Sequence, residues 1–233
     1  MTGSTPRYYY TVYPRAPAPG RVSTSRVEVA HIVIAYLVLT FDLVLILSGS
    51  TYLARGSFAL SFNAYTIEVA AAAALTGFLA HEMAHKIAAQ RRHSWAEFRM
   101  FPVGLIFSVF TAAFGFLFAA PGATMVGGMQ DSRAWGETSL AGPVTNLGFA
   151  TVFLLAASVI GSSSAVWPWF VALITLAFFN GWFAVFNLLP FGPLDGRKIL
   201  SWSASAWVAA FAASVVVTVL AFVVTNSGAP LSL

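Results

Sequence analysis

Cysteine is absent from the 233-residue chain, and charged residues make up only 9% of it. The lack of cysteine excludes disulfides, thiolate metal sites and cysteine nucleophiles, so any metal ligands must be His, Asp or Glu. Soluble globular proteins average about a quarter charged residues. A chain that is 58% hydrophobic, with a mean hydropathy of +0.79, is instead an integral membrane protein. This composition excludes a soluble enzyme and a nucleic-acid-binding protein.

The few charges lie mainly at the ends of the hydrophobic runs, where they determine orientation in a membrane. Residues 1–26 are polar and contain four arginines and four prolines, which predicts a flexible basic tail in the cytoplasm. Residues 27–233 are expected to form a single membrane-embedded domain with its core at 65–200. No soluble domain and no internal repeat is expected in that domain.

Five apolar runs are long enough to cross a bilayer, which takes about 20 residues. They predict an all-α membrane protein, a polytopic helical bundle with spans over residues 27–47, 65–89, 139–160, 167–189 and 204–224. With the N-terminus in the cytoplasm and the C-terminus outside, nearly all Lys and Arg residues lie on the cytoplasmic side, and only Arg55 lies outside. Asp42, inside the first run, is expected to pair or to snorkel near the outer surface.

The apolar segment from Phe101 to Gly128 could also span the membrane, but one crossing there would invert every later helix. It would place Arg197 and Lys198 outside, against the positive-inside rule. We therefore expect a re-entrant or interfacial hairpin that turns at Pro121–Gly122, with its backbone covered by protein or by a wet cavity. Within it, residues 123–129 form either a plain interfacial loop or a strand that pairs with an extended substrate segment.

Two histidines four residues apart, His81 and His85, lie inside the second run with Glu82 between them. Residues four apart share one face of a helix, so both imidazoles can reach one metal ion while Glu82 stands beside them as a base. Soluble zinc peptidases use the same pentad. The alternative is a polar patch that caps the inner end of the span, but ionisable side chains at membrane depth are costly and usually functional.

A zinc peptidase needs three protein ligands and one open position for water. The chain has only eight acidic residues, and Asp195 is the best candidate for the third ligand. It follows the fourth predicted span at the depth where His81 and His85 end the second, which places all three in the cytoplasmic third of the membrane. The alternative is a solvated carboxylate in a turn after a helix.

Three motifs, in this order, resemble the site-2 protease family of intramembrane zinc metallopeptidases, in a compact form without a PDZ or CBS domain. They are His-Glu-Met-Ala-His at 81–85, Ala-Gly-Pro-Val-Thr-Asn at 141–146 and Asn-Leu-Leu-Pro-Phe-Gly-Pro-Leu-Asp-Gly at 187–196. The resemblance implies that one Zn²⁺ per chain is held by His81, His85 and Asp195. It also implies that Glu82 is the catalytic acid and base.

For two asparagines the resemblance implies a part in substrate binding. Asn187 opens the third motif and is expected to help place the substrate; the alternative is an interhelical hydrogen bond, which asparagine commonly makes in membranes. Asn146 matches the polar residue of the central motif, whose role is less defined. Gly142 and Pro143, in the same motif, are expected to allow close helix packing rather than to contact a reacting group.

The sequence thus predicts an intramembrane zinc endopeptidase that cleaves membrane-spanning proteins near the cytoplasmic side, in regulated intramembrane proteolysis. Its expected partners are transmembrane protein substrates and the lipid bilayer, and no nucleic acid. The alternative is a catalytically silent metal-binding scaffold or an ion pathway. The glutamate between the histidines argues against that alternative, because metal binding alone does not need a base.

Overall fold

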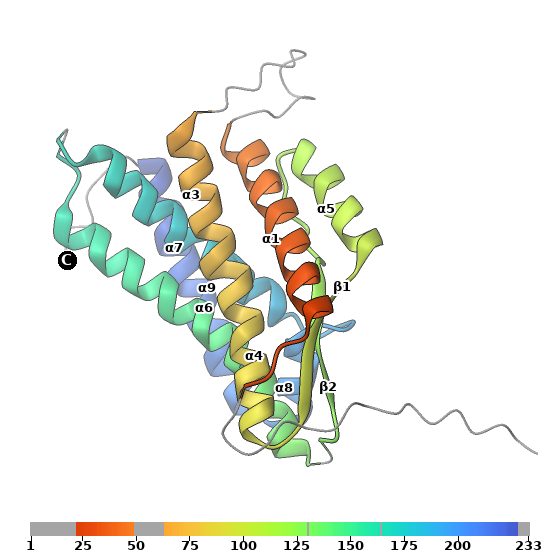
Figure 1. The fold of residues 1–233 in the computed structure, drawn as a ribbon. Helices are drawn as coiled ribbons and strands as arrows, with labels where there is room; N and C mark the ends of the chain where they lie inside the picture. The colour runs from red at the N-terminus through yellow and green to blue at the C-terminus, as the bar shows by residue number, and fades with distance from the viewer. Residues whose placement is uncertain (1–21, 49–62, 130, 164, 228–233) are drawn as a thin grey trace, which may run out of the picture.

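The computed structural model describes residues 22–48, 63–129, 131–163 and 165–227, so most of the predicted tail, and Arg55, lie outside the described residues. It confirms the predicted helical bundle, because five helices within the described part are long and apolar enough to cross a membrane (Figure 1). In chain order they are α1 (Arg26–Leu47), a run made of α3 (Ala64–Ala74), η1 (Leu75–Leu79) and α4 (Ala80–Arg91), then α6 (Ser132–Ile160), α7 (Trp167–Asn187) and α9 (Ala204–Ser227).

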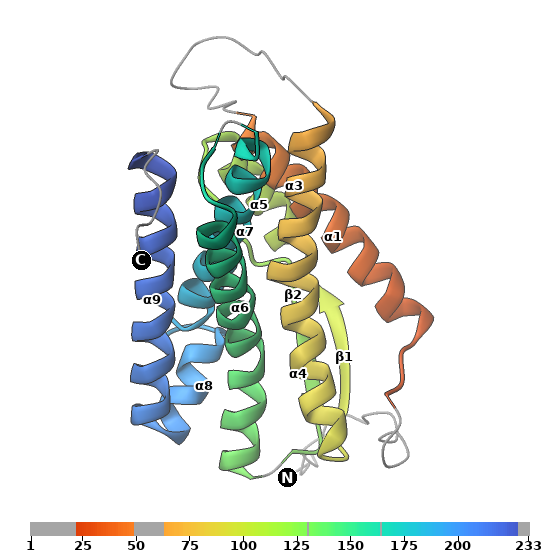
Figure 2. The same cartoon turned by 90° about the vertical axis from the view of Figure 1, so that its left-hand side faces the viewer.

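The bundle is layered around α6 and α7, which pack against each other. The α4 segment contacts α6, and α9 contacts both α6 and α7. Four shorter elements complete the described part: β1 (Trp95–Met100), α5 (Pro102–Ala113), β2 (Gly122–Gly127) and α8 (Asp195–Trp202). Figure 2 shows that the end of α4, the start of α6 and α8 lie at the same lower end of the molecule. The chain therefore brings segments far apart in sequence to one end of the bundle.

Helix α6 begins well before its predicted span: it starts at Ser132, whereas the apolar run begins near residue 139. Asp131 caps it, because its carboxylate accepts hydrogen bonds from the backbone N–H groups of Arg133 and Ala134. The added residues include Ser132, Arg133 and Glu137 and lie ahead of the apolar run. Hydropathy therefore located the membrane-spanning part of α6, while the cap set its first residue.

The segment from Phe101 to Gly128 differs from the predicted hairpin, because the chain does not turn at Pro121–Gly122. Instead β1 and β2 pair as antiparallel strands, with Met100 opposite Gly122, and α5 lies between them in sequence. Proline at the first helical position, Pro102, favours a helix start there, so the apolar run folds as α5. With 12 residues, α5 is too short to span a bilayer alone.

Position 42 lies on the face of α1 that packs against α5. Asp42 is fully buried, and its carboxylate accepts a hydrogen bond of 2.6 Å from the Ser108 hydroxyl of α5. The side chain therefore pairs with a neighbouring helix and does not snorkel to the surface, because α5 covers it. In Figure 1, α5 lies beside α1 at the edge of the bundle.

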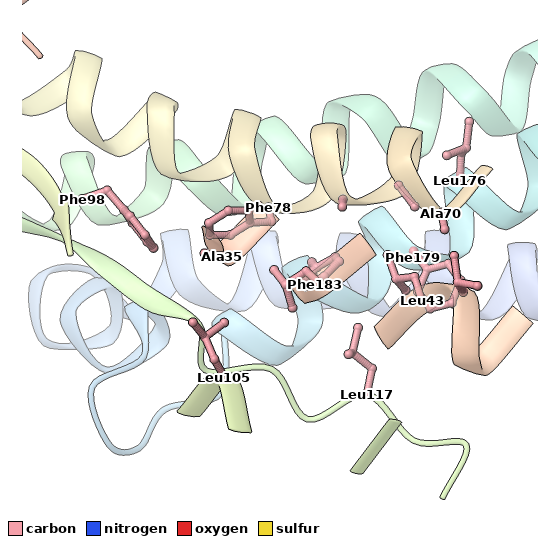
Figure 3. Close-up of a cluster of buried hydrophobic side chains, with 14 residues drawn as sticks. Ala35, Leu43, Ala70, Phe78, Phe98, Leu105, Leu117, Leu176, Phe179 and Phe183 are labelled. Atoms are coloured by element: carbon pink, nitrogen blue, oxygen red, sulfur yellow. The ribbon is translucent and has the colours of Figure 1, made fainter. Parts of the chain in front are cut away.

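The main hydrophobic cluster joins α1 to the helix that carries the two histidines (Figure 3). Its α1 members include Leu39 and Leu43, which are fully buried. Small residues allow close packing here: a Cβ on Gly77 would come within 2.5 Å of the Phe183 ring of α7. The cluster thereby fixes η1, which directly precedes α4, against α1 and α7.

Candidate metal site

The three predicted ligand side chains meet at one buried point. One ligand atom from each of His81, His85 and Asp195 lies within 4.8 Å of the others, which is a group that could hold a metal ion. The two imidazole Nε2 atoms are 3.0 Å apart, and Asp195 Oδ2 lies 3.4 Å from Nε2 of His81 and 2.9 Å from Nε2 of His85. All three side chains are buried. The structure thus assembles residues from α4 and α8 that are more than 100 positions apart.

These separations suit a small tetrahedral ion. Two nitrogen or oxygen ligands about 2.1 Å from such an ion lie about 3.4 Å from each other. The observed separations of 3.0, 3.4 and 2.9 Å are close to that value. Two imidazoles and one carboxylate, with a fourth side left to the pocket described below, match the donor set of a catalytic zinc site.

Hydrogen bonds to the far side of each ring set the imidazole orientation. Nδ1 of His81 lies 2.5 Å from Oδ1 of Asn146, and Nδ1 of His85 lies 2.8 Å from the backbone oxygen of Thr138. Carbonyl oxygens only accept hydrogen bonds, so each ring carries a hydrogen on Nδ1. With a metal ion bound there, each ring would be neutral and would direct its Nε2 lone pair to the shared point, which is the arrangement that metal-binding histidines require.

Asp195 is held by Lys198, which lies just after the third motif. The ammonium of Lys198 donates to Oδ1 at 3.1 Å, which leaves Oδ2 to face the two imidazoles. Burial raises the pKa of Asp195, but nearby His85, hydrogen bonds from both histidines and the charge of Lys198 lower it well below its usual range. The carboxylate is therefore ionised. Gly196 allows the start of α8 to lie close to the end of α7, because a Cβ there would overlap the backbone carbonyl of Leu188.

Glu82 lies beside the cluster and is held by β2. Its Oε2 accepts two hydrogen bonds from Thr124, one from the backbone N–H at 2.8 Å and one from the hydroxyl at 2.7 Å. Sequence reasoning did not single out Thr124. The only sequence signal for it was the strand-like stretch 123–129, most of which lies in the strand β2. The strand therefore fixes one carboxylate oxygen of Glu82.

A pocket of about 110 Å³ contains both the ligand cluster and Glu82. Its other walls come from β2, from the end of α7 and from α8, and include Val126, Asn187 and Lys198. Asn187 lines this pocket and donates to the Phe183 carbonyl of its own helix at 3.0 Å, so that hydrogen bond is not interhelical. Its predicted contact with a substrate stays a prediction.

Asn146 lies behind the cluster rather than in the pocket lining. Its side chain is fully buried, and its amide contacts His81, the Gly77 carbonyl and Asn180. A role in substrate binding stays a prediction for this residue. Among the described contacts, the Asn146 side chain meets the ring of His81.

Gly142 packs more closely on the cluster than the sequence suggested. A Cβ there would come within 2.7 Å of Nε2 and Cε1 of His81 and would also overlap the ring of His85. The expected close packing of α6 is therefore packing against the two predicted ligand rings. The motif Ala-Gly-Pro carried this signal, but the partner of the glycine could not be known from sequence.

The sequence is similar to that of an archaeal protein. A protein of Methanocaldococcus jannaschii, designated provisionally as a zinc metalloprotease, is 33% identical to the chain over 136 residues. The matched region covers 57% of this chain and 69% of the relative. No family profile and no solved structure matches the chain.

Proposed function

This chain belongs to the zinc metalloprotease family of the Methanocaldococcus jannaschii protein, and from that premise we propose that it is an intramembrane zinc endopeptidase of the site-2 protease type. The observation that carries the proposal is a buried His81, His85 and Asp195 cluster beside Glu82. Both histidines lie in a helix long and apolar enough to cross a membrane. A protease site at that depth suits substrates that are themselves in the membrane.

One zinc ion per chain would be held by Nε2 of His81, Nε2 of His85 and Oδ2 of Asp195. When bound, zinc supplies Lewis-acid chemistry, which polarises a carbonyl and lowers the pKa of a water to about 7. The residues behind the ligands hold them for this role. Asn146 and Thr138 fix the two rings, and Lys198 fixes the carboxylate.

Glu82 is the group that moves the proton. Its carboxylate takes a proton from the attacking water as the oxygen adds to the peptide carbonyl carbon, and returns it to the amine nitrogen as the C–N bond breaks. Thr124 occupies Oε2 with two hydrogen bonds, while no hydrogen bond to Oε1 is found among the described residues. Oε1 is therefore the oxygen available to carry this proton.

The edge of β2 is placed to bind an extended peptide. Residues of an antiparallel strand direct their backbone groups alternately toward and away from the partner strand. The N–H of Thr124 points away from β1, to Glu82, so Val126 two residues later directs its backbone to the same side. Val126 lines the pocket. We propose that a locally unwound substrate segment pairs with this edge and so presents a peptide bond to Glu82.

Orientation in the membrane follows the same proposal. Basic residues gather where α4 ends, where α6 begins and in α8, and they include Arg91, Arg92, Arg133 and Arg197. We propose that this end faces the cytoplasm, with the N-terminus inside and the C-terminus outside. Cleavage of membrane-spanning proteins near that side would release a cytoplasmic segment, as in regulated intramembrane proteolysis.

The experiment that tests the proposal compares the wild type with Glu82→Gln in lipid vesicles that also contain synthetic single-span substrates. Glu82→Gln is expected to keep one zinc per chain and to lose about 10²–10⁴-fold in cleavage rate, because the proton carrier is lost. Zinc content is measured on the same samples. Cleavage at the wild-type rate by the zinc-loaded variant would contradict the mechanism. A wild type that holds zinc and cleaves no substrate would favour the silent scaffold.

A further inference from the structure

The helix that carries His81 contains a wider, π-helical turn just before that residue. Residues Leu75–Leu79 form the π-helix η1, and the N–H of Ala80 donates to the carbonyl of Leu75, five residues back. In a regular α-helix that N–H would bond to the carbonyl of Thr76. The π-helix therefore releases a carbonyl toward a neighbouring helix, and such turns occur frequently at functional sites.

Asn146 of α6 uses the carbonyls of this widened turn. Its Nδ2 donates to the Gly77 carbonyl at 2.9 Å and approaches the Thr76 carbonyl at 3.4 Å. Because these partners only accept, the amide nitrogen must face them, and Oδ1 must face the opposite way. That oxygen lies 2.5 Å from Nδ1 of His81. The orientation of the Asn146 amide is thus fixed by η1.

A second asparagine extends the network. Oδ1 of Asn180, on α7, lies 3.3 Å from Nδ2 of Asn146, while Nδ2 of Asn180 donates to the Thr76 hydroxyl at 2.8 Å and to the Leu176 carbonyl at 2.9 Å. Thr76 in turn donates to the Ala72 carbonyl at 2.8 Å. Each hydrogen bond in this network has one assignment of donor and acceptor, and these assignments agree with one another. Both asparagines are fully buried.

We propose that Thr76, Asn180 and Asn146 are positioning residues that keep the hydrogen of His81 on Nδ1 and aim its Nε2 at the metal. This inference rests on the proposed function, because it takes His81 as a zinc ligand. The network reaches His81 from three helices, whereas His85 is fixed by one backbone carbonyl, that of Thr138. The ring orientation of His81 therefore depends on side chains, which substitutions can remove, whereas that of His85 depends on a backbone carbonyl.

The test measures zinc dissociation constants by chelator competition, and the visible spectrum of the Co²⁺-substituted protein. Asn146→Leu keeps the branched side-chain shape and removes the acceptor, so we expect zinc to bind about 10–100-fold more weakly and the cobalt bands to shift. Asn146→Asp keeps an acceptor for Nδ1–H and is expected to bind zinc more tightly than Asn146→Leu. Thr145→Val is the matched control on the same helix, because within the described part of the chain that hydroxyl donates to the carbonyl of Ala141, away from His81.

Comparison with His81→Ala separates the two proposals. If His81→Ala keeps wild-type zinc affinity, the proposed ligand set is wrong. If His81→Ala loses zinc while Asn146→Leu keeps the wild-type affinity and cobalt bands, only the positioning network is wrong. Should Asn146→Leu fail to fold, Asn180→Ala takes its place, with several-fold weaker zinc binding and shifted bands expected, and unchanged values overturning the inference.

Discussion

The two strands of the small sheet have outer edges of opposite character. Side chains block the outer edge of β1: Glu28 accepts from the Phe98 N–H at 3.0 Å, and Gln90 donates to the Ala96 carbonyl at 2.9 Å. The outer edge of β2 meets Glu82 at Thr124 and otherwise faces the pocket. An unblocked edge is a template for pairing with another chain. The protein thus covers the outer edge of β1 with buried polar groups and leaves the edge of β2 beside Glu82 available.

The largest expected effect comes from breaking the sealed edge. Glu28 pairs with Lys86, and both side chains are fully buried. Lys86→Met would leave the Glu28 carboxylate buried without its counter-charge, and we expect the free energy of unfolding to fall by about 3–5 kcal/mol. Unfolding in mixed micelles measures this loss. The double variant with Glu28→Gln is expected to recover part of it; a single variant as stable as the wild type would show that the pair does not seal the edge.

A substitution on the open edge is expected to affect cleavage instead of stability. Val126→Pro removes a backbone N–H that no β1 residue uses, so the sheet should form while a pairing substrate loses one hydrogen bond. We expect kcat/KM to fall about tenfold, with zinc content unchanged. Val126→Ala, which keeps the N–H, is the control. Equal losses in both variants would assign the effect to the side chain and remove the evidence for strand pairing.

The smallest expected effect is a difference in hydrogen exchange between the two strand edges, which needs no substitution. Backbone hydrogen exchange of the wild type should be slow at Phe98, whose N–H is bonded to a buried carboxylate, and at least about tenfold faster at Val126. Adding a substrate-derived peptide that resists cleavage should slow exchange at Val126 and leave Phe98 unchanged. Equal protection of the two amides in the free protein would contradict the difference between the edges.

Local periodicity predicted the parts of the site that lie on one helix. His81 and His85 share a face because helix geometry alone puts residues four apart together, and the depth of the spans brought Asp195 to them. The apolar runs likewise located the five long helices of the described residues. These features depend on short-range spacing and on the thickness of a bilayer, and sequence contains both.

Contacts that depend on tertiary packing were beyond sequence reasoning. Nothing in the neighbourhood of Asn146 indicates that it meets His81, since the contact requires η1 to widen and α6 to cross at that height. The hairpin turn was misplaced for a similar reason. Pro121–Gly122 is a common turn pair, but Pro102 started a helix, and pairing with β1 drew residue 122 into a strand.

The glycine at position 142 has a mechanical consequence. With no side chain there, the backbone of α6 rests directly on the two imidazole rings of α4, and any separation of these helices would pull the ring of His85 away from the Thr138 carbonyl that orients it. We therefore expect α4 and α6 to move as one rigid body. If the proposed function holds, a substrate helix entering from the lipid would pass between other elements, because the contact between α4 and α6 would stay closed.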